Sequence, residues 1–203
     1  MIRVTRRWRP AVHRPPRFRR SVAALLLALL TVLPLLGCGI RAQELTRDIQ
    51  PQGLDTSTDL SAGGTAVTSF ALSLLQSSDA GRTARLLSPL SVLYALGMTA
   101  NGASGETLKQ IETAAGMSLT ELNDYLYTFR MSLPANSKSA RLSLADSLWL
   151  RDVFRAEDDF LRACVNYYGA EVYRSAFDAT LPSDVNAWVE KHTDGMIDAI
   201  LPE

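Results

Sequence analysis

The chain has 203 residues, 47% of them hydrophobic and 21% charged, which is ordinary for one soluble domain. The formal net charge is zero, but it is unevenly distributed. Residues 1–37 contain eight arginines and no acidic residue, which leaves 13 basic and 21 acidic residues from Cys38 onward, a formal charge of −8. An acidic mature chain argues against nucleic acid as a partner.

The first 37 residues have the layout of a signal peptide. A basic region of 20 residues precedes an apolar stretch from Ser21 to Leu36, which is short for a membrane span and is followed by small residues. The sequence Leu35-Leu36-Gly37-Cys38 resembles a bacterial lipobox, in which the cysteine is acylated and becomes the new N-terminus. We predict lipidation at Cys38 and an exported, membrane-anchored protein. An ordinary secretory signal with a chance cysteine is the alternative.

After the signal peptide the sequence predicts a tether and then a folded domain. Residues 38–64 are rich in Gln, Thr, Ser, Asp and Gly, which is typical of a flexible tether. Apolar residues at helical spacing begin at Ala66, so we place the domain over residues 65–203. The periodicity, with capping residues, predicts six helices: 66–75, 88–101, 104–115, 118–133, 156–168 and one that begins at Pro182.

The segment from Leu86 to Gly105 is the centre of this prediction. It carries no charged residue, and apolar side chains cover every side of its helix. The dipeptide Ser88-Pro89 is a helix start, and Asn101-Gly102 is a helix end. A helix that is apolar all round is buried or crosses a membrane, and about 14 residues are too few to cross. We therefore expect the central buried helix of a globular domain.

Two segments have the alternation of strands. They are residues 140–150 and residues 171–177, and a third short strand is possible over 83–87. Asp146 lies on the apolar side of the first alternation, where a carboxylate needs hydrogen-bond partners. Two short strands make a poor sheet with exposed edges, so the sequence indicates part of a larger α+β fold.

Three segments resemble the serpin family. The first is LLSPLSVLYALGMTANGASGETLKQI, similar to the family's helix B to helix C region. The second is SLWLRDVFRAEDDFLRACVNYYGAEV, similar to strand 2A, helix E and strand 1A. The third, Val185-Asn186-Ala187-Trp188-Val189-Glu190 with Thr193-Asp194-Gly195-Met196-Ile197, is similar to helix F. Their order and spacing agree over about 140 residues, which implies the N-terminal half of the serpin fold, with six helices and the first strands of sheets A and B.

The resemblance implies suicide inhibition of serine, and sometimes cysteine, proteases without a cofactor. In that mechanism the protease cleaves a reactive loop, and the loop inserts into sheet A. We expect that loop to lie outside these 203 residues, so that they do not inhibit alone. An inert truncated product and a lipid-anchored helical binding module are the alternatives.

The resemblance also singles out individual residues. Ser88 and Ser91 match serines of the shutter, the region beneath sheet A that parts when a strand inserts. Without the resemblance, Ser88 is a helix cap and Ser91 a packing residue. Asp146 stands where serpins usually have Asn, and aspartate cannot donate a hydrogen bond as asparagine does.

No catalytic or metal site is expected. Cys164 and His192 could be imagined as nucleophile and base, but Cys164 lies on an apolar helix face and nothing in the sequence brings His192 near it. We predict a buried core thiol and assign Trp188 to core packing. With Cys38 lipidated, Cys164 has no disulfide partner, and the ligand count is too low for a metal.

Overall fold

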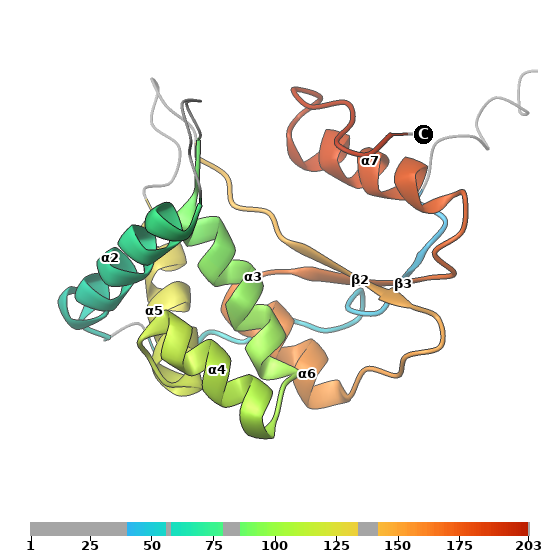
Figure 1. Ribbon diagram of the computed structural model, residues 1–203. Helices are drawn as coiled ribbons and strands as arrows, with labels where there is room; N and C mark the ends of the chain where they lie inside the picture. The colour runs from blue at the N-terminus through green and yellow to red at the C-terminus, as the bar shows by residue number, and fades with distance from the viewer. Residues whose placement is uncertain (1–39, 56–57, 79–85, 134–141, 203) are drawn as a thin grey trace, which may run out of the picture. The chain divides into compact units, whose positions relative to one another are not determined.

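The helix predicted at the centre of the domain is helix α3 (Pro89–Asn101) in a computed structural model that describes residues 40–55, 58–78, 86–133 and 142–202 (Figure 1). The Ser88 side chain caps its first turn, as the sequence predicted. One face of the helix is fully buried, with Leu93 inaccessible to solvent and Tyr94 only 2% exposed. The opposite face, at Ser91, Ala95 and Thr99, is exposed, so the helix is buried on one side.

Helices surround α3 on its buried side. They are α2 (Leu60–Ser77), α4 (Gly105–Ala115), α5 (Leu119–Ser132) and α6 (Asp158–Ala163), and each contacts α3. The predicted capping box starts α5, where Ser118 and Glu121 bond each other's backbone amides. The Tyr94 hydroxyl crosses the core and donates to the Leu126 carbonyl at 2.9 Å. The main hydrophobic core therefore lies between α3 and these helices.

The last turn after α6 widens into a π-helix, η2 (Cys164–Tyr168), where the sequence predicted continuous α-helix to residue 168. The segment ends at Gly169, whose φ of 63° lies in the left-handed region that glycine adopts without strain. The amide of Ala170 then donates to the Cys164 carbonyl at 3.1 Å and closes the helix.

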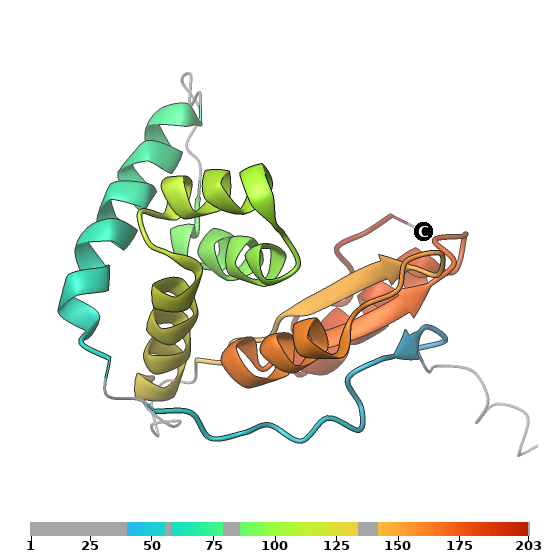
Figure 2. The same ribbon diagram turned by 90° about the horizontal axis from the view of Figure 1, so that it is seen from below.

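A three-stranded sheet adjoins the helices. Strands β1 (Gln43–Glu44), β2 (Ser147–Arg151) and β3 (Glu171–Ser175) lie in the order β1-β3-β2. Strands β2 and β3 are parallel and are joined through α6 and η2, whereas β1 runs antiparallel to β3 (Figure 2). The strands predicted over 140–150 and 171–177 are therefore real but shorter. The second ends because Phe177 has a φ of 56°, which breaks the extended backbone.

The two faces of the sheet serve different cores, because side chains alternate along each strand. Leu148, Leu150 and Val172 face the main core with α6. Trp149 and Tyr173 point the other way, stack at 4.5 Å between ring centroids, and pack toward helix α7 (Leu181–His192). Figure 1 shows α7 and α6 on opposite sides of the sheet.

The prediction of a flexible tether over 38–64 was wrong for residues 40–55 and for the start of α2. Residues 43–44 form β1, and the amide of Leu54 donates to the Tyr127 hydroxyl at 3.0 Å. The outer edge of β3, which we expected to be unpaired, is covered by this segment. Figure 2 shows it running as extended chain from the sheet toward the helical cluster. Helix α2 begins at Leu60, capped by Asp59.

Several predictions fall where the structure is not described. The signal peptide, Cys38 and the possible strand at 83–85 lie outside the described residues, as do 140 and 141. Within the part of the chain that is described, no helix combines the length and the apolar character needed to traverse a bilayer.

Candidate functional site

The first turn of α3 brings Ser88 and Ser91 together. Their hydroxyl oxygens lie 2.7 Å apart, and the Ser91 amide donates to the Ser88 oxygen at 3.4 Å. Both residues are exposed at the surface. The cap that the sequence predicted is therefore present, and the hydroxyl of Ser91 is close enough to exchange a hydrogen bond with it. Their role in a shutter stays a prediction.

Cys164 and His192 occupy separate environments. Cys164 is inaccessible to solvent within the main core, and burial raises the pKa of its thiol to about 12. A thiol with that pKa is protonated at neutral pH and is a poor nucleophile. The His192 ring instead stacks on Trp188 at the end of α7, with 4.2 Å between the ring centroids. The structure thus agrees with a core thiol, and no group of three metal-ligating side chains occurs among the described residues.

Asp146 lies directly before β2, and its backbone carbonyl accepts from the Glu171 amide at 3.1 Å. Burial raises the pKa of its carboxyl group, and the positive charge of Arg130 offsets that rise only in part. A raised carboxyl pKa means that the folded protein disfavours the charged form. From the sequence we expected a carboxylate at this position to need hydrogen-bond partners, and an environment that disfavours its charged form is consistent with that expectation.

The Glu171 carboxylate contacts three polar side chains, which the sequence did not indicate. Its Oε2 accepts from the Tyr173 hydroxyl at 2.6 Å and from the Trp188 indole at 2.7 Å, and its Oε1 lies 3.3 Å from Nε2 of His192. Nδ1 of His192 lies 2.8 Å from the Trp188 carbonyl. These contacts connect β3 to α7, so Trp188 is a hydrogen-bond donor as well as a core residue.

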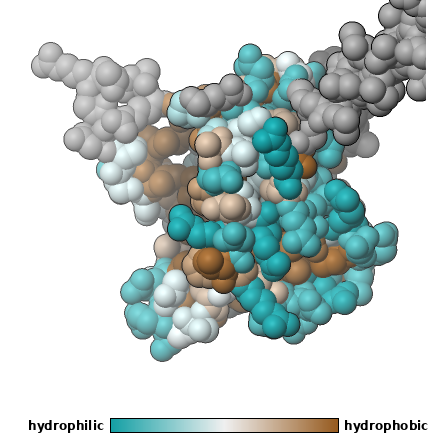
Figure 3. All heavy atoms as spheres, turned by 90° about the vertical axis from the view of Figure 1, so that its right-hand side faces the viewer, coloured by the Kyte–Doolittle hydropathy of each residue, from teal (hydrophilic) through white to brown (hydrophobic). Residues whose placement is uncertain are grey.

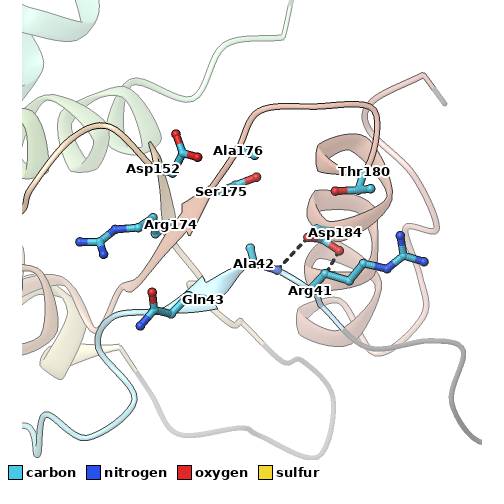
Figure 4. Close-up of a pocket in the computed structure, with 9 residues that line it drawn as sticks. All are labelled: Arg41, Ala42, Gln43, Asp152, Arg174, Ser175, Ala176, Thr180 and Asp184. Carbon is cyan, nitrogen blue, oxygen red and sulfur yellow. Dashed lines mark hydrogen bonds between the residues drawn. The ribbon is translucent and has the colours of Figure 1, made fainter.

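Asp184 is the second residue that the sequence analysis missed. It stands in the first turn of α7, is only 4% exposed, and accepts the backbone amides of Arg41 and Ala42 at 3.0 and 2.9 Å. These amides lie more than 140 residues away in sequence, so no local pattern could have revealed them. Figure 4 shows both hydrogen bonds at the edge of a shallow pocket of about 290 Å³ that also contains Arg174 and Asp152.

A larger and more apolar groove of about 570 Å³ lies on the other side of the sheet. It is formed by the end of α3, by Leu148 and Leu150 of β2, and by Phe154 and Phe160 around α6. Phe154 is 62% exposed. Figure 3 shows the face at the right-hand side of Figure 1, which is largely hydrophilic with a few separate hydrophobic patches.

This geometry agrees with the family suggested by the sequence motifs, and the comparison with known proteins decides the matter. Residues 65–203 match the family described as serpin, or serine protease inhibitor. The chain belongs to the serpin family. Its six described helices and partial sheet are those of the N-terminal half of the serpin fold, as predicted.

Individual serpins give the extent of the similarity. Neuroserpin of Gallus gallus is 34% identical over 117 residues, which cover 55% of this chain and 28% of that protein. The native state of the thermophilic serpin tengpin has a TM-score of 0.75 and 36% identity, covering 81% of this chain and 43% of tengpin. The latent state of tengpin gives a TM-score of 0.62 and 40% identity, over 75% and 41%. The chain thus spans less than half the length of these relatives.

Proposed function

We propose that this chain is the N-terminal part of an exported serpin that inhibits serine, and in some cases cysteine, proteases. The observation that carries the proposal is the structural similarity to native tengpin, with a TM-score of 0.75 over 81% of this chain. In a serpin of this class the protease cleaves the reactive loop and is held as an acyl-enzyme. Insertion of the loop into the sheet as a new strand then traps the protease.

The proposal assigns these 203 residues a supporting part in that mechanism. We expect the reactive loop and the strands that flank it to lie in the portion of the relatives that the chain does not match. We therefore expect no inhibition by these residues alone. Sequencing beyond the codon for Glu203 separates this proposal from an inert truncated product, since an open frame encoding further serpin strands is required for the former.

The test is complex formation with proteases. Protein from the extended reading frame is incubated with trypsin, chymotrypsin, elastase and papain, and the mixtures are examined on denaturing gels. A complex that survives denaturation, with loss of protease activity, supports inhibition. Cleavage of the protein as an ordinary substrate by all four, with no complex, contradicts it. The 203-residue chain is the matched control and should yield no complex.

Ser88 and Ser91 are proposed as the helix side of the shutter. Their adjacent hydroxyls could change partners without leaving a buried group unpaired. In the extended protein, Ser91→Ala should change the rate at which a synthetic loop peptide inserts, while leaving the Ser88 cap in place. Ser73→Ala on α2, which removes a hydroxyl outside this turn, is the control. An unchanged insertion rate in Ser91→Ala would leave Ser88 and Ser91 as a cap and its neighbour.

Membrane anchoring through Cys38 is a separate proposal, supported by the lipobox-like sequence alone. Cells expressing the protein are fed a labelled fatty acid and then fractionated. Label and membrane association that both disappear in Cys38→Ser support lipidation. Release of unlabelled wild-type protein into the medium favours an ordinary secretory signal.

A lipid-anchored binding module is the second candidate, and the apolar groove beside β2 is the observation that favours it. In that case the groove would bind an apolar partner segment. Phe154→Asp, placed at its rim, should abolish capture of such a partner, whereas Val153→Asp next to it should not. If the extended reading frame fills the groove with its own strand, this candidate fails.

A further inference from the structure

Residues 40–55 contact strand β3, the π-helix η2 and helix α7, all in the second half of the domain. Leu45 donates its amide to the Val172 carbonyl of β3 at 2.7 Å, and the Val172 amide donates to the Thr46 hydroxyl at 3.1 Å. Farther along, the amide of Gln52 donates to Asn166 in η2 at 2.9 Å. Thr46 is only 5% exposed. A segment with these contacts is part of the domain, so we name residues 40–55 the strap.

The strap also supplies part of the core beneath α7. Ile40 and Ala42 pack in the smaller hydrophobic cluster with Tyr173, Trp188 and Val189. Leu45 and Thr46 are both at least partly buried, and over residues 40–44 the partly buried Ile40, Ala42 and Glu44 alternate with the exposed Arg41 and Gln43. This alternation is that of an edge strand with one face inward. Without the strap, α7 would lose two of the apolar residues against which it packs.

The Asp184 carboxylate fastens the strap to α7. Each of its oxygens accepts one of two consecutive backbone amides, from Arg41 and Ala42, and the side chain is nearly inaccessible to solvent (Figure 4). A buried carboxylate needs such donors, and hydrogen bonds to a charged acceptor are stronger than neutral ones. Because the donors are backbone groups, the side chain of Arg41 is not required.

We infer that the strap is a fastener for helix α7, latched by Asp184, and that α7 and the strap loosen together when the latch is removed. The strap closes the outer edge of β3 at the same time, so release also exposes a strand edge. The inference depends only on contacts within residues 40–202 and not on protease inhibition.

Hydrogen exchange followed by mass spectrometry tests the coupling in the whole chain. Asp184→Ala should raise the exchange rates of amides in both 40–47 and 181–192 by at least about tenfold, the equivalent of one charge-assisted hydrogen bond. Asp184→Asn, which retains one acceptor, should fall between this variant and the wild type. Asp178→Ala is the matched control, because Asp178 is also an aspartate near the start of α7 but bonds Thr180. Arg41→Ala should likewise leave exchange unchanged.

Two further measurements keep the inference falsifiable if Asp184→Ala folds poorly. Labelling of Cys164, which is buried in the main core, reports global unfolding and should stay slow in Asp184→Ala. Trypsin should cleave after Arg41 and Arg47 faster in this variant than in the wild type. If 40–47 is released while exchange in 181–192 stays at the wild-type rate, the coupling is refuted. If wild-type 40–47 already exchanges freely, the strap itself is refuted.

Discussion

Glu171 concentrates the polar contacts between β3 and α7 on one carboxylate. Burial raises its pKa, but hydrogen bonds from Tyr173 and Trp188 and the charges of His192 and Lys191 outweigh burial, so the net pKa is lowered from its ordinary value of 4.5. A carboxyl group whose pKa is lowered on folding stabilises the protein above its unfolded pKa. That stability is lost as the pH falls through the folded pKa.

Glu171→Gln should therefore destabilise the domain at pH 7 and have little effect in acid. We expect a loss of roughly 1 kcal/mol at pH 7, allowing for the solvent that reaches this carboxylate. Urea unfolding at pH 7 and at pH 3.5 measures the difference, with the exposed Glu190→Gln on α7 as the control. An equal loss at both pH values would show that charge is not what Glu171 contributes.

Asp146, where the resemblance to serpins led us to expect asparagine, holds a carboxyl group in an environment that disfavours its charge. Burial raises its pKa despite the nearby Arg130. A carboxyl group with a raised folded pKa weakens the protein once it ionises, so the cost is present at neutral pH and disappears as the pH falls through the folded pKa.

Asp146→Asn should stabilise the domain at pH 7, by about 1 kcal/mol, because the amide carries no charge to bury. The gain should shrink toward pH 4, as the aspartate becomes protonated. Thermal unfolding at both pH values is the measurement, and Asp152→Asn, at an exposed position, is the control. A loss of stability at pH 7 would mean that the carboxylate makes an interaction that asparagine cannot replace.

At the scale of elements, the packing of α3 on η2 depends on Gly97. A Cβ atom added there would overlap the Tyr168 ring and hydroxyl. That hydroxyl is held in a polar network with Asn101 and Asn123, so the ring cannot move aside without breaking hydrogen bonds. The close approach of helix to ring therefore requires glycine in the middle of a helix.

Gly97→Ala should destabilise the domain by about 1–3 kcal/mol, even though alanine has the higher helix propensity. Gly64→Ala on α2 is the matched control, because nothing lies within 4 Å of the added Cβ. The control should be neutral or slightly stabilising. Chemical unfolding of both variants checks the pair, and equal effects would show that Tyr168 accommodates the methyl group.

Elements with local signals were predictable, and those with distant partners were not. Helices α3 and α5 were placed correctly because their starts are marked by local signals, Ser88-Pro89 and the Ser118–Glu121 capping box. Strand β1 was missed because it spans only Gln43 and Glu44, two polar residues with no apolar alternation to mark a strand. Asp184 and Glu171 were missed for a different reason: side-chain hydrogen bonds such as those from the Arg41 amide to Asp184 and from the Trp188 indole to Glu171 leave no periodic pattern in the sequence.

At the scale of the whole molecule, the strap shortens the length of free chain between a lipid anchor at Cys38 and the domain. The predicted tether would have allowed 27 residues of free chain between lipid and domain. The docked strap begins at Ile40, so only Gly39 separates the proposed lipid site from the first residue held by the domain. An anchored serpin of this kind would stay close to the membrane surface unless the strap is released.

The amount of exposed apolar surface bears on whether residues 40–203 are stable by themselves. Large apolar side chains are exposed across the described part of the chain, with Phe154 62%, Ile200 58% and Met196 82% accessible. Each exposed apolar side chain forgoes the stabilising free energy that its burial would contribute to folding. Exposed apolar patches also promote aggregation. The matched serpins extend to more than twice this length, and the additional chain would cover such surfaces. We therefore expect residues 40–203 alone to bind a hydrophobic dye and to unfold broadly below about 50 °C. Protein from the extended reading frame should bind less dye and unfold cooperatively at higher temperature. A sharp, high-temperature transition for residues 40–203, without dye binding, would instead mark them as a self-sufficient domain.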